Sequence, residues 1–135
     1  MITANNYQDI QIMQNADFEN IITFDASVYD VDNYKYKAII AKDRNGTAFT
    51  YDGNSNTTFV GLTVTKTSNG TTSQTVTLKL TAAQTSKFED DFEGVWDLLA
   101  QEVSGGSPTG TYIREMEGEV VISPSVSTLT NHEFS

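Results

Sequence analysis

The sequence contains no cysteine and a single histidine, His132. The absence of cysteine excludes disulfide frameworks, thiolate metal sites and cysteine nucleophiles together. A Ser/His/Asp triad or a histidine-based metal site would have to be built on His132 alone. This residue lies in a C-terminal stretch without periodicity, which is a poor scaffold for either site, so we assign it no role. The sequence therefore predicts no catalytic residues, no metal and no cofactor, and we expect a protein that is not an enzyme.

Long apolar runs are also missing, and no segment approaches the length of a membrane span. The first residues, 1–9, have neither a basic region nor an apolar run, so we expect no secretion signal and synthesis in a cytosol. Basic residues are few: 8 Lys and Arg face 18 Asp and Glu, giving a formal net charge of -10. This charge repels phosphate backbones and anionic lipids, which argues against nucleic-acid and membrane partners and otherwise provides solubility.

Alternation of apolar and polar side chains is the dominant pattern in the sequence. Val76, Leu78 and Leu80 alternate with Thr77 and Lys79, which is typical of a half-buried strand. Similar patterns predict strands over 10–12, 18–24, 34–40, 47–51, 60–64, 76–80, 92–103 and 111–125. Turn signals separate them, including 52–56 and the Gly/Ser/Pro-rich stretch 104–110. Thr81 and Gln84 have capping-box spacing and predict a short helix near 82–88, with Phe88 as its apolar contact.

The two longest predicted strands form a hairpin with one apolar and one acidic face. The apolar face contains Trp96, Leu98, Ala100, Met116, Gly118, Val120 and Ile122, and the acidic face contains Glu115, Glu117 and Glu119. Such a hairpin must place its apolar side on another sheet. The sequence therefore predicts a single domain over 1–135, an antiparallel β-sandwich of about seven to eight strands. We expect an ordered core over 7–126 and flexible arms at 1–6 and 127–135.

Several acidic groups and aromatic side chains could form a calcium site, an acid–base pair or a carbohydrate platform. Glu89, Asp90, Asp91 and Glu93 could ligate calcium, although a solvated turn is the simpler interpretation. The stretch that starts at Asp52 begins like an EF-hand loop but lacks its glycine and its final glutamate. The pairs Asp17/Glu19 and Asp30/Asp32 are interpreted as surface charges rather than as a general acid and base. A carbohydrate platform could be built from Trp96, Tyr34, Tyr36, Tyr51 and Tyr112, of which the first three are expected in the core.

Three groups of residues resemble a structural module of bacteriophage virions. They are Gln14 to Phe18, Asp32 to Ala38, and the closing set of 76–85, Val95 to Leu98 and 117–124. The module is similar to the N-terminal domain of the baseplate upper protein in phages of Gram-positive bacteria. The resemblance spans about residues 7–128. It departs at Asn15, where the pattern has glycine, and at Gly94, where a glycine before the Trp96 strand is displaced.

The resemblance implies an immunoglobulin-like sandwich in a non-enzymatic virion protein of the tail or baseplate, made in the host cytoplasm. Its partners would be other virion proteins of the tail, baseplate or fibres, and further copies of itself. A head decoration protein and a carbohydrate-binding adhesion module remain the alternatives. The apolar residues of the two arms that we expect at a partner interface are Ile2, Tyr7, Leu129 and Phe134.

Overall fold

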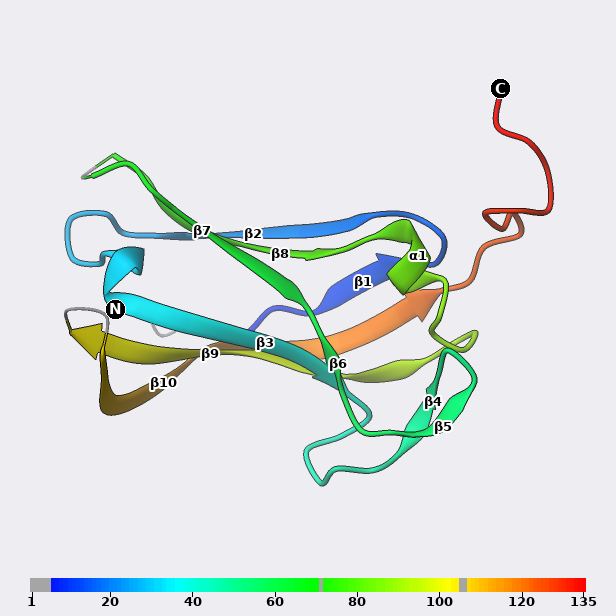
Figure 1. Cartoon of the computed structure of the whole chain (residues 1–135), viewed down its shortest axis with the longest axis horizontal. Helices are drawn as coiled ribbons and strands as arrows, with labels where there is room; N and C mark the ends of the chain where they lie inside the picture. The colour runs from blue at the N-terminus through cyan, green and yellow to red at the C-terminus, as the bar shows by residue number, and fades with distance from the viewer. Residues whose placement is uncertain (1–5, 71, 105–106) are drawn as a thin grey trace.

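The computed structural model describes residues 6–70, 72–104 and 107–135, and strands dominate it (Figure 1). The five-stranded sheet contains, in spatial order, β1 (Ile10–Met13), β10 (Ser107–Ser123), β9 (Glu93–Ser104), β3 (Tyr34–Ala41) and β6 (Val60–Gly61). The three-stranded sheet contains β2 (Phe18–Phe24), β8 (Gln74–Leu80) and β7 (Thr63–Ser68). A separate hairpin consists of β4 (Phe49–Tyr51) and β5 (Asn54–Thr57). The helical elements are the 3-10 turn η1 (Val31–Asn33) and the single turn α1 (Ala82–Thr85).

The two larger sheets pack face to face, which confirms the predicted all-β sandwich (Figure 1). β1 joins the sheet formed by β10, β9 and β3, opposite the sheet formed by β2, β8 and β7. One part of the prediction is wrong, because β1 runs parallel to β10, with Ile10 opposite Val120 and Ile12 opposite Ile122. The remaining strand pairs are antiparallel, as expected.

The region between β3 and β8 contains more strands than the sequence predicted. The stretch 52–56, expected as a turn, instead contains the start of β5 after a tight turn at Asp52 and Gly53, both of which have positive φ. The single strand expected over 60–64 is divided at Leu62, so that β6 pairs with β3 and β7 pairs with β8. The chain therefore crosses from one sheet to the other at this residue.

The predicted capping box is confirmed. The Thr81 hydroxyl accepts from the backbone N–H of Gln84 at 3.2 Å, and the Gln84 side chain accepts from the backbone N–H of Thr81 at 2.8 Å. The helix is shorter than expected because it ends at Thr85 rather than near residue 88. Phe88 is buried beyond its end, as predicted.

The core lies between the sheets and is centred on the β9–β10 hairpin. Trp96, Leu98, Val120 and Ile122 are all buried, on the faces that the alternation assigned to them. Gly118 lies opposite Trp96 in the ladder. A Cβ atom at Gly118 would lie 1.9 Å from the carbonyl oxygen of Gln8, so only glycine fits between these segments. The Trp96 indole N–H donates to the same carbonyl at 2.8 Å and thereby fixes the approach of the N-terminal segment.

Candidate interaction surfaces and a buried polar cluster

The predicted interface residues occupy different surroundings. Ile2 lies outside the described residues. Tyr7 is 51% exposed, and the segment around it extends the parallel pairing of β1, because Gln8 N–H donates to the carbonyl of Glu117 at 2.9 Å. Leu129 is half-buried, whereas Phe134 is 82% exposed. The structure therefore does not bring Tyr7 together with the C-terminal pair.

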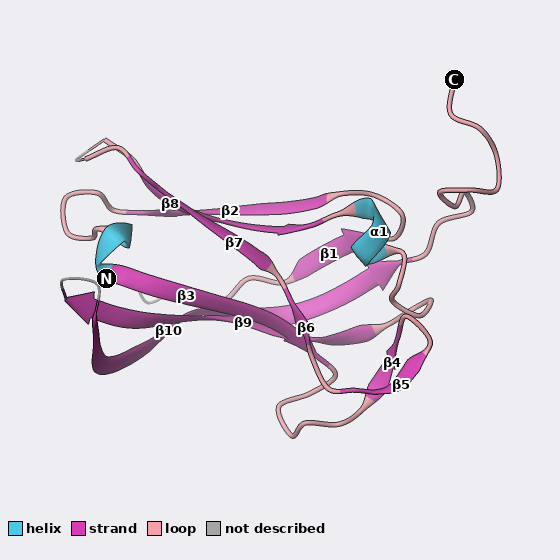
Figure 2. Cartoon of the chain, viewed as in Figure 1, coloured by secondary structure: helices cyan, strands magenta, loops and turns pink. Residues whose placement is uncertain are grey.

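The residues 124–135, here called the C-terminal segment, contain no strand and lead away from the sandwich (Figure 2). Asn15, in the turn after β1, ties the segment to the body by donating from its side-chain amide to the carbonyl of Ser127 at 3.1 Å. Beyond it, Thr128 and Asn131 hydrogen-bond each other locally. A pocket of about 320 Å³ opens between the segment and this turn, and its lining includes Met13, Asn15, Pro124, Leu129 and Phe134. Leu129 and Phe134 thus share one small surface.

A β-bulge places Glu115 inside the sandwich, which makes the prediction for this residue wrong. The ladder pairs Arg114 with Leu99 and Met116 with Leu98, so Glu115 is the extra residue on β10. A bulge turns two successive side chains towards one face, and both Glu115 and Met116 are buried. Alternation counted along the sequence cannot detect the shift, because it assumes one residue per ladder position.

Glu115 belongs to a buried polar cluster with Tyr29 and Tyr36. The Tyr29 hydroxyl donates to Glu115 Oε1 at 2.8 Å, and the hydroxyls of Tyr29 and Tyr36 lie 2.7 Å apart. Glu115 Oε2 is buried without a hydrogen-bond partner among the described residues. Burial raises the pKa of the Glu115 carboxyl, and the hydrogen bond from Tyr29 opposes this effect. Burial also raises the pKa of both tyrosine hydroxyls, so they stay protonated and serve as donors.

Gln74 extends the polar arrangement at the same end of the sandwich. Its side-chain oxygen accepts from the backbone N–H of Val31 at 2.8 Å. Its side-chain nitrogen donates to the Ser68 hydroxyl at 2.8 Å and to the carbonyl of Gly70 at 2.7 Å. Gln74 is 1% exposed and Glu115 is fully buried. Because both side chains are buried, a substrate would have no access to them. The hydrogen bonds of Gln74 instead hold η1 and the β7–β8 turn in place.

The acidic candidates from the sequence serve mainly as local caps. Asp17 accepts from the backbone N–H of Ala82 at the start of α1, at 2.7 Å. Asp30 caps η1 by accepting from the backbone N–H of Asp32 at 2.9 Å. Asp90 accepts from the Gln14 side chain at 3.0 Å. Within the described ranges, no group of three or more His, Asp or Glu side chains is arranged to hold a metal ion.

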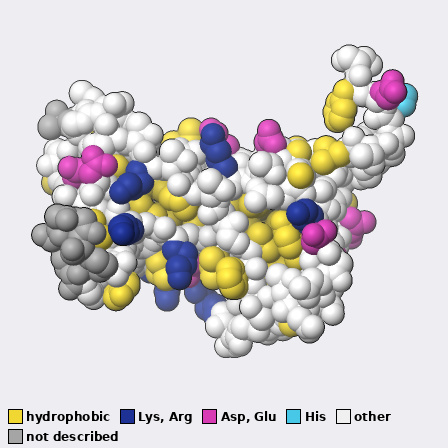
Figure 3. All heavy atoms as spheres, viewed as in Figure 1, with side chains coloured by type: hydrophobic (Ala, Val, Ile, Leu, Met, Phe, Trp, Pro, Cys, Tyr) yellow, Lys and Arg dark blue, Asp and Glu magenta, His cyan; other side chains and the backbone are white. Residues whose placement is uncertain are grey.

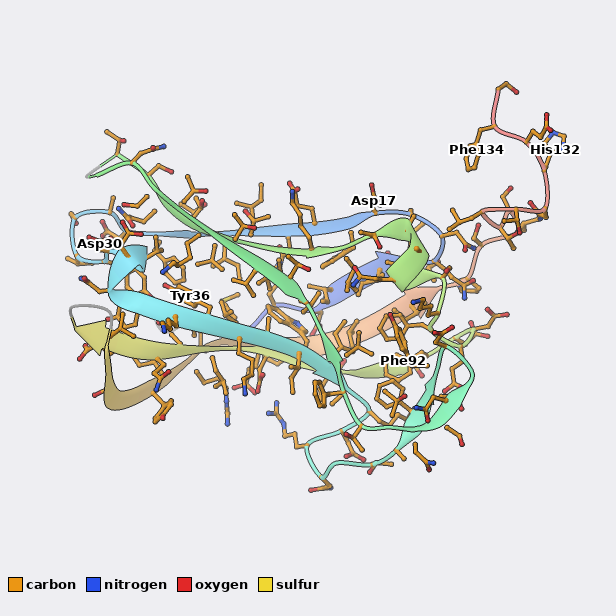
Figure 4. The ribbon with its side chains drawn as sticks, in the orientation of Figure 1. Asp17, Asp30, Tyr36, Phe92, His132 and Phe134 are labelled. Carbon is orange, nitrogen blue, oxygen red and sulfur yellow. The ribbon has the colours of Figure 1, made fainter. Side chains whose placement is uncertain are left out.

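The predicted aromatic platform is divided by the fold. Trp96 is 2% exposed and Tyr34 and Tyr36 pack against the core, as expected. Tyr51 is half-buried, and its hydroxyl donates to the carbonyl of Gln84 at 3.0 Å. Tyr112 is 68% exposed on the outer face of the five-stranded sheet. His132 is exposed in the C-terminal segment (Figure 4).

The outer face of the five-stranded sheet carries a second shallow pocket, of about 400 Å³. Arg44, Arg114, Asp97 and Phe59 are among its lining residues, and Phe59 is 57% exposed. Glu117 forms ion pairs with Arg44 and, at 3.5 Å, with Arg114. The hydrogen bond from Arg44 lowers the pKa of Glu117, whereas burial raises the pKa of Asp97. Sequence patterning located the strands but not this pocket, because Arg44 reaches the face from a loop.

No protein-family model matches the chain, and no curated protein matches it either. Among the described residues, no helix is both long enough and apolar enough to cross a bilayer.

Proposed function

We propose that this protein is a non-enzymatic structural component of a bacteriophage virion. Its place is the tail or baseplate, where it connects the tail machinery to fibres or receptor-binding proteins. The partners are other virion proteins. The resemblance of the sequence to a structural module of phage virions supports this role.

The C-terminal segment is the observation that carries the proposal. It leaves the sandwich after β10 and holds exposed apolar side chains at Val126, which is 98% exposed, and at Phe134 (Figure 4). Apolar groups on a segment with few contacts to its own body gain burial when a neighbouring subunit covers them, at the cost of ordering the segment. A connector needs such a contact in addition to a rigid body.

The closing set of residues that carries the resemblance belongs to both large sheets and to α1. The stretch 76–85 forms most of β8 and α1, Val95 to Leu98 lies in β9, and 117–124 contains the last part of β10. These elements provide the rigid body to which the C-terminal segment is attached. Their buried members, among them Val76, Leu78, Trp96 and Val120, are apolar because the core of the sandwich requires it.

The test is to separate heads from tails of purified particles of the phage that encodes the chain, and to detect the protein in each fraction by mass spectrometry. We expect it with the tails, in few copies per particle. Detection only with the heads, in many copies, would instead make it a decoration protein. Absence from both fractions would contradict a virion role altogether.

A removal experiment then tests the C-terminal segment. Deletion of residues 126–135 should leave the sandwich folded but prevent incorporation into particles, and Phe134→Ser should weaken incorporation. Val28→Ser is a matched control, because Val28 is 68% exposed but lies in a loop away from this segment. Unchanged incorporation of the deletion variant would mean that the segment is not the attachment point.

A carbohydrate-binding module is the second candidate, and one observation favours it. Phe59 and Tyr112 are two exposed aromatic residues associated with the same sheet. Flat rings of this kind stack on sugar faces. Binding of host-surface oligosaccharides, lost in Phe59→Ala and Tyr112→Ala but not in Phe134→Ala, would support this function over the connector.

A further inference from the structure

The outer face of the five-stranded sheet is open and mixed in character. Ladder register places its side chains in transverse rows across β3, β9 and β10. The rows are Lys35, Gln101 and Tyr112; then Lys37, Leu99 and Arg114; then Ile39, Asp97 and Glu117; then Ala41, Val95 and Glu119. Ile39, Val95 and Leu99 point outward around Asp97 and are half-buried, so apolar area lies between the charged side chains of this face. Interfaces combine apolar area with polar and charged groups in this way.

The charges on this face are separated along the strands. The first two rows form a basic half with Lys35, Lys37 and Arg114. The last two rows, together with Glu93 in the next position of β9, form an acidic half with Glu93, Asp97, Glu117 and Glu119. Arg44 and Arg114 both pair with Glu117, so these contacts offset only part of the acidic half.

The concentration of cations is unusual for this chain. Four of its 8 basic residues, Lys35, Lys37, Arg44 and Arg114, lie on this one face, although the formal net charge is -10. Figure 3 shows Lys and Arg side chains gathered beside and below β3. An acidic protein does not need a cluster of Lys and Arg for its solubility. The cluster lies next to an acidic half, so a partner surface with the same separation of charge would complement it.

We propose that this face is a self-association surface, occupied by the same face of a second copy of the chain. A two-fold axis between the faces, parallel to the sheets and across the strands, sets the basic half of each copy opposite the acidic half of the other. The contact is isologous, so one arrangement of charges satisfies both copies. Leu99 and Ile39, in the two rows beside the axis, provide apolar burial in a contact that the charges orient.

This inference goes beyond the virion role, since a dimer of this kind would form wherever the protein resides. A connector that stayed monomeric, or a dimer outside any particle, would separate the two proposals. Each proposal can therefore be contradicted without the other: the location of the protein in particles tests the virion role, and its mass in solution tests self-association.

The test is the mass of the full chain in solution as a function of concentration, by sedimentation equilibrium. We expect a shift from the 14.8 kDa monomer towards twice that mass at about 100 µM, where a dimer with a Kd near 10 µM predominates. The double variant Lys35→Glu/Lys37→Glu makes both halves acidic, and Glu93→Lys/Glu119→Lys removes the net negative charge of the acidic half, where Asp97 and Glu117 remain. Each should weaken self-association at least tenfold, and an equimolar mixture of the two should form a mixed dimer.

The matched control is Lys79→Glu/Lys87→Glu, away from this face. Each Lys→Glu replacement changes the charge by two units, so both lysine pairs take the formal net charge from -10 to -14. The control should associate nearly as well as the original chain. A monomer at all concentrations would overturn the proposal, and so would equal weakening in the control and in Lys35→Glu/Lys37→Glu. If the chain stayed monomeric at all concentrations and bound oligosaccharides at this face, the face would be a carbohydrate-binding surface instead.

Discussion

The two ends of the sandwich differ in how far they depend on buried hydrogen bonds (Figure 4). At the α1 end, Phe49, Phe88 and Phe92 pack ring against ring, with centroids 4.9 to 5.3 Å apart, and Lys42 lies over the ring of Phe92. At the η1 end, the buried side chains of Glu115 and Gln74 hydrogen-bond to hydroxyls and backbone groups. The η1 end also contains the stacked rings of Phe24, Tyr29 and Tyr34, so it combines apolar area with buried hydrogen bonds, whereas ring packing dominates the α1 end.

This difference determines how each end should respond to substitution. Apolar packing is non-directional, so a smaller side chain costs lost burial plus the cavity that remains, in proportion to the atoms removed. A buried hydrogen bond is directional, so removal of one partner costs the desolvation of the group that is left. Four substitutions test this contrast.

Phe92→Ala should give the largest loss at the aromatic end. Phe92 is 2% exposed and contacts two other rings, so the variant should lower the free energy of unfolding by about 3–5 kcal/mol. Chemical denaturation measures this loss. Phe92→Leu keeps most of the volume and should lose much less. Equal losses in the two variants would show that the end is not sensitive to volume.

Gln74→Leu should be the most damaging change at the polar end. Leucine fills a similar volume but leaves the Val31 N–H and the Gly70 carbonyl without their partner. We expect a loss of about 2 kcal/mol in denaturation experiments. The exposed Gln11 provides the control, because Gln11→Leu should change stability by less than about 0.5 kcal/mol. A neutral Gln74→Leu variant would mean that this end, too, depends on area alone.

Glu115→Gln should change how stability depends on pH. The pKa of Glu115 is raised in the folded state, so the unfolded chain releases this proton first as pH rises. The stability that the proton provides is present below the unfolded pKa and is lost as pH rises through the folded pKa. Glutamine does not titrate and so removes this loss. Between acidic and neutral pH, the free energy of unfolding should therefore decrease less in the variant than in the original chain.

At acidic pH, Glu115→Gln and the original chain should differ by no more than about 1 kcal/mol, because the hydrogen bond from Tyr29 is retained. Glu102→Gln serves as the control, since Glu102 is a half-exposed carboxyl of the neighbouring strand. Parallel pH profiles for the original chain and Glu115→Gln would contradict the role assigned to the buried carboxyl.

Phe134→Ser should have the smallest effect on stability, because the ring belongs to neither end. At 82% exposure its loss should change the unfolding free energy by less than about 0.5 kcal/mol. Thermal unfolding of the two proteins should therefore coincide. A large destabilisation would show that the C-terminal segment is part of the folded body and would weaken its proposed use as an attachment.

Elements in which local chemistry and burial agree can be predicted from the amino-acid pattern. The strict alternation around Leu78 predicted β8, the pair Thr81 and Gln84 predicted the cap of α1, and the face that contains Trp96 was assigned correctly. Each of these depends on residues close together in the chain. The burial of Phe88, the expected apolar contact of the short helix, was likewise predicted correctly.

Tertiary structure alone decided the features that depend on pairing between distant strands. The bulge that buries Glu115 exists only because β10 contains one residue more than β9 across the ladder. The division at Leu62 and the parallel alignment of β1 with β10 likewise follow from which neighbours are available in space. Separation of charge on the outer face appears only once the registers of three strands are fixed. Periodicity specifies which face of a strand is apolar, whereas register specifies what that face meets.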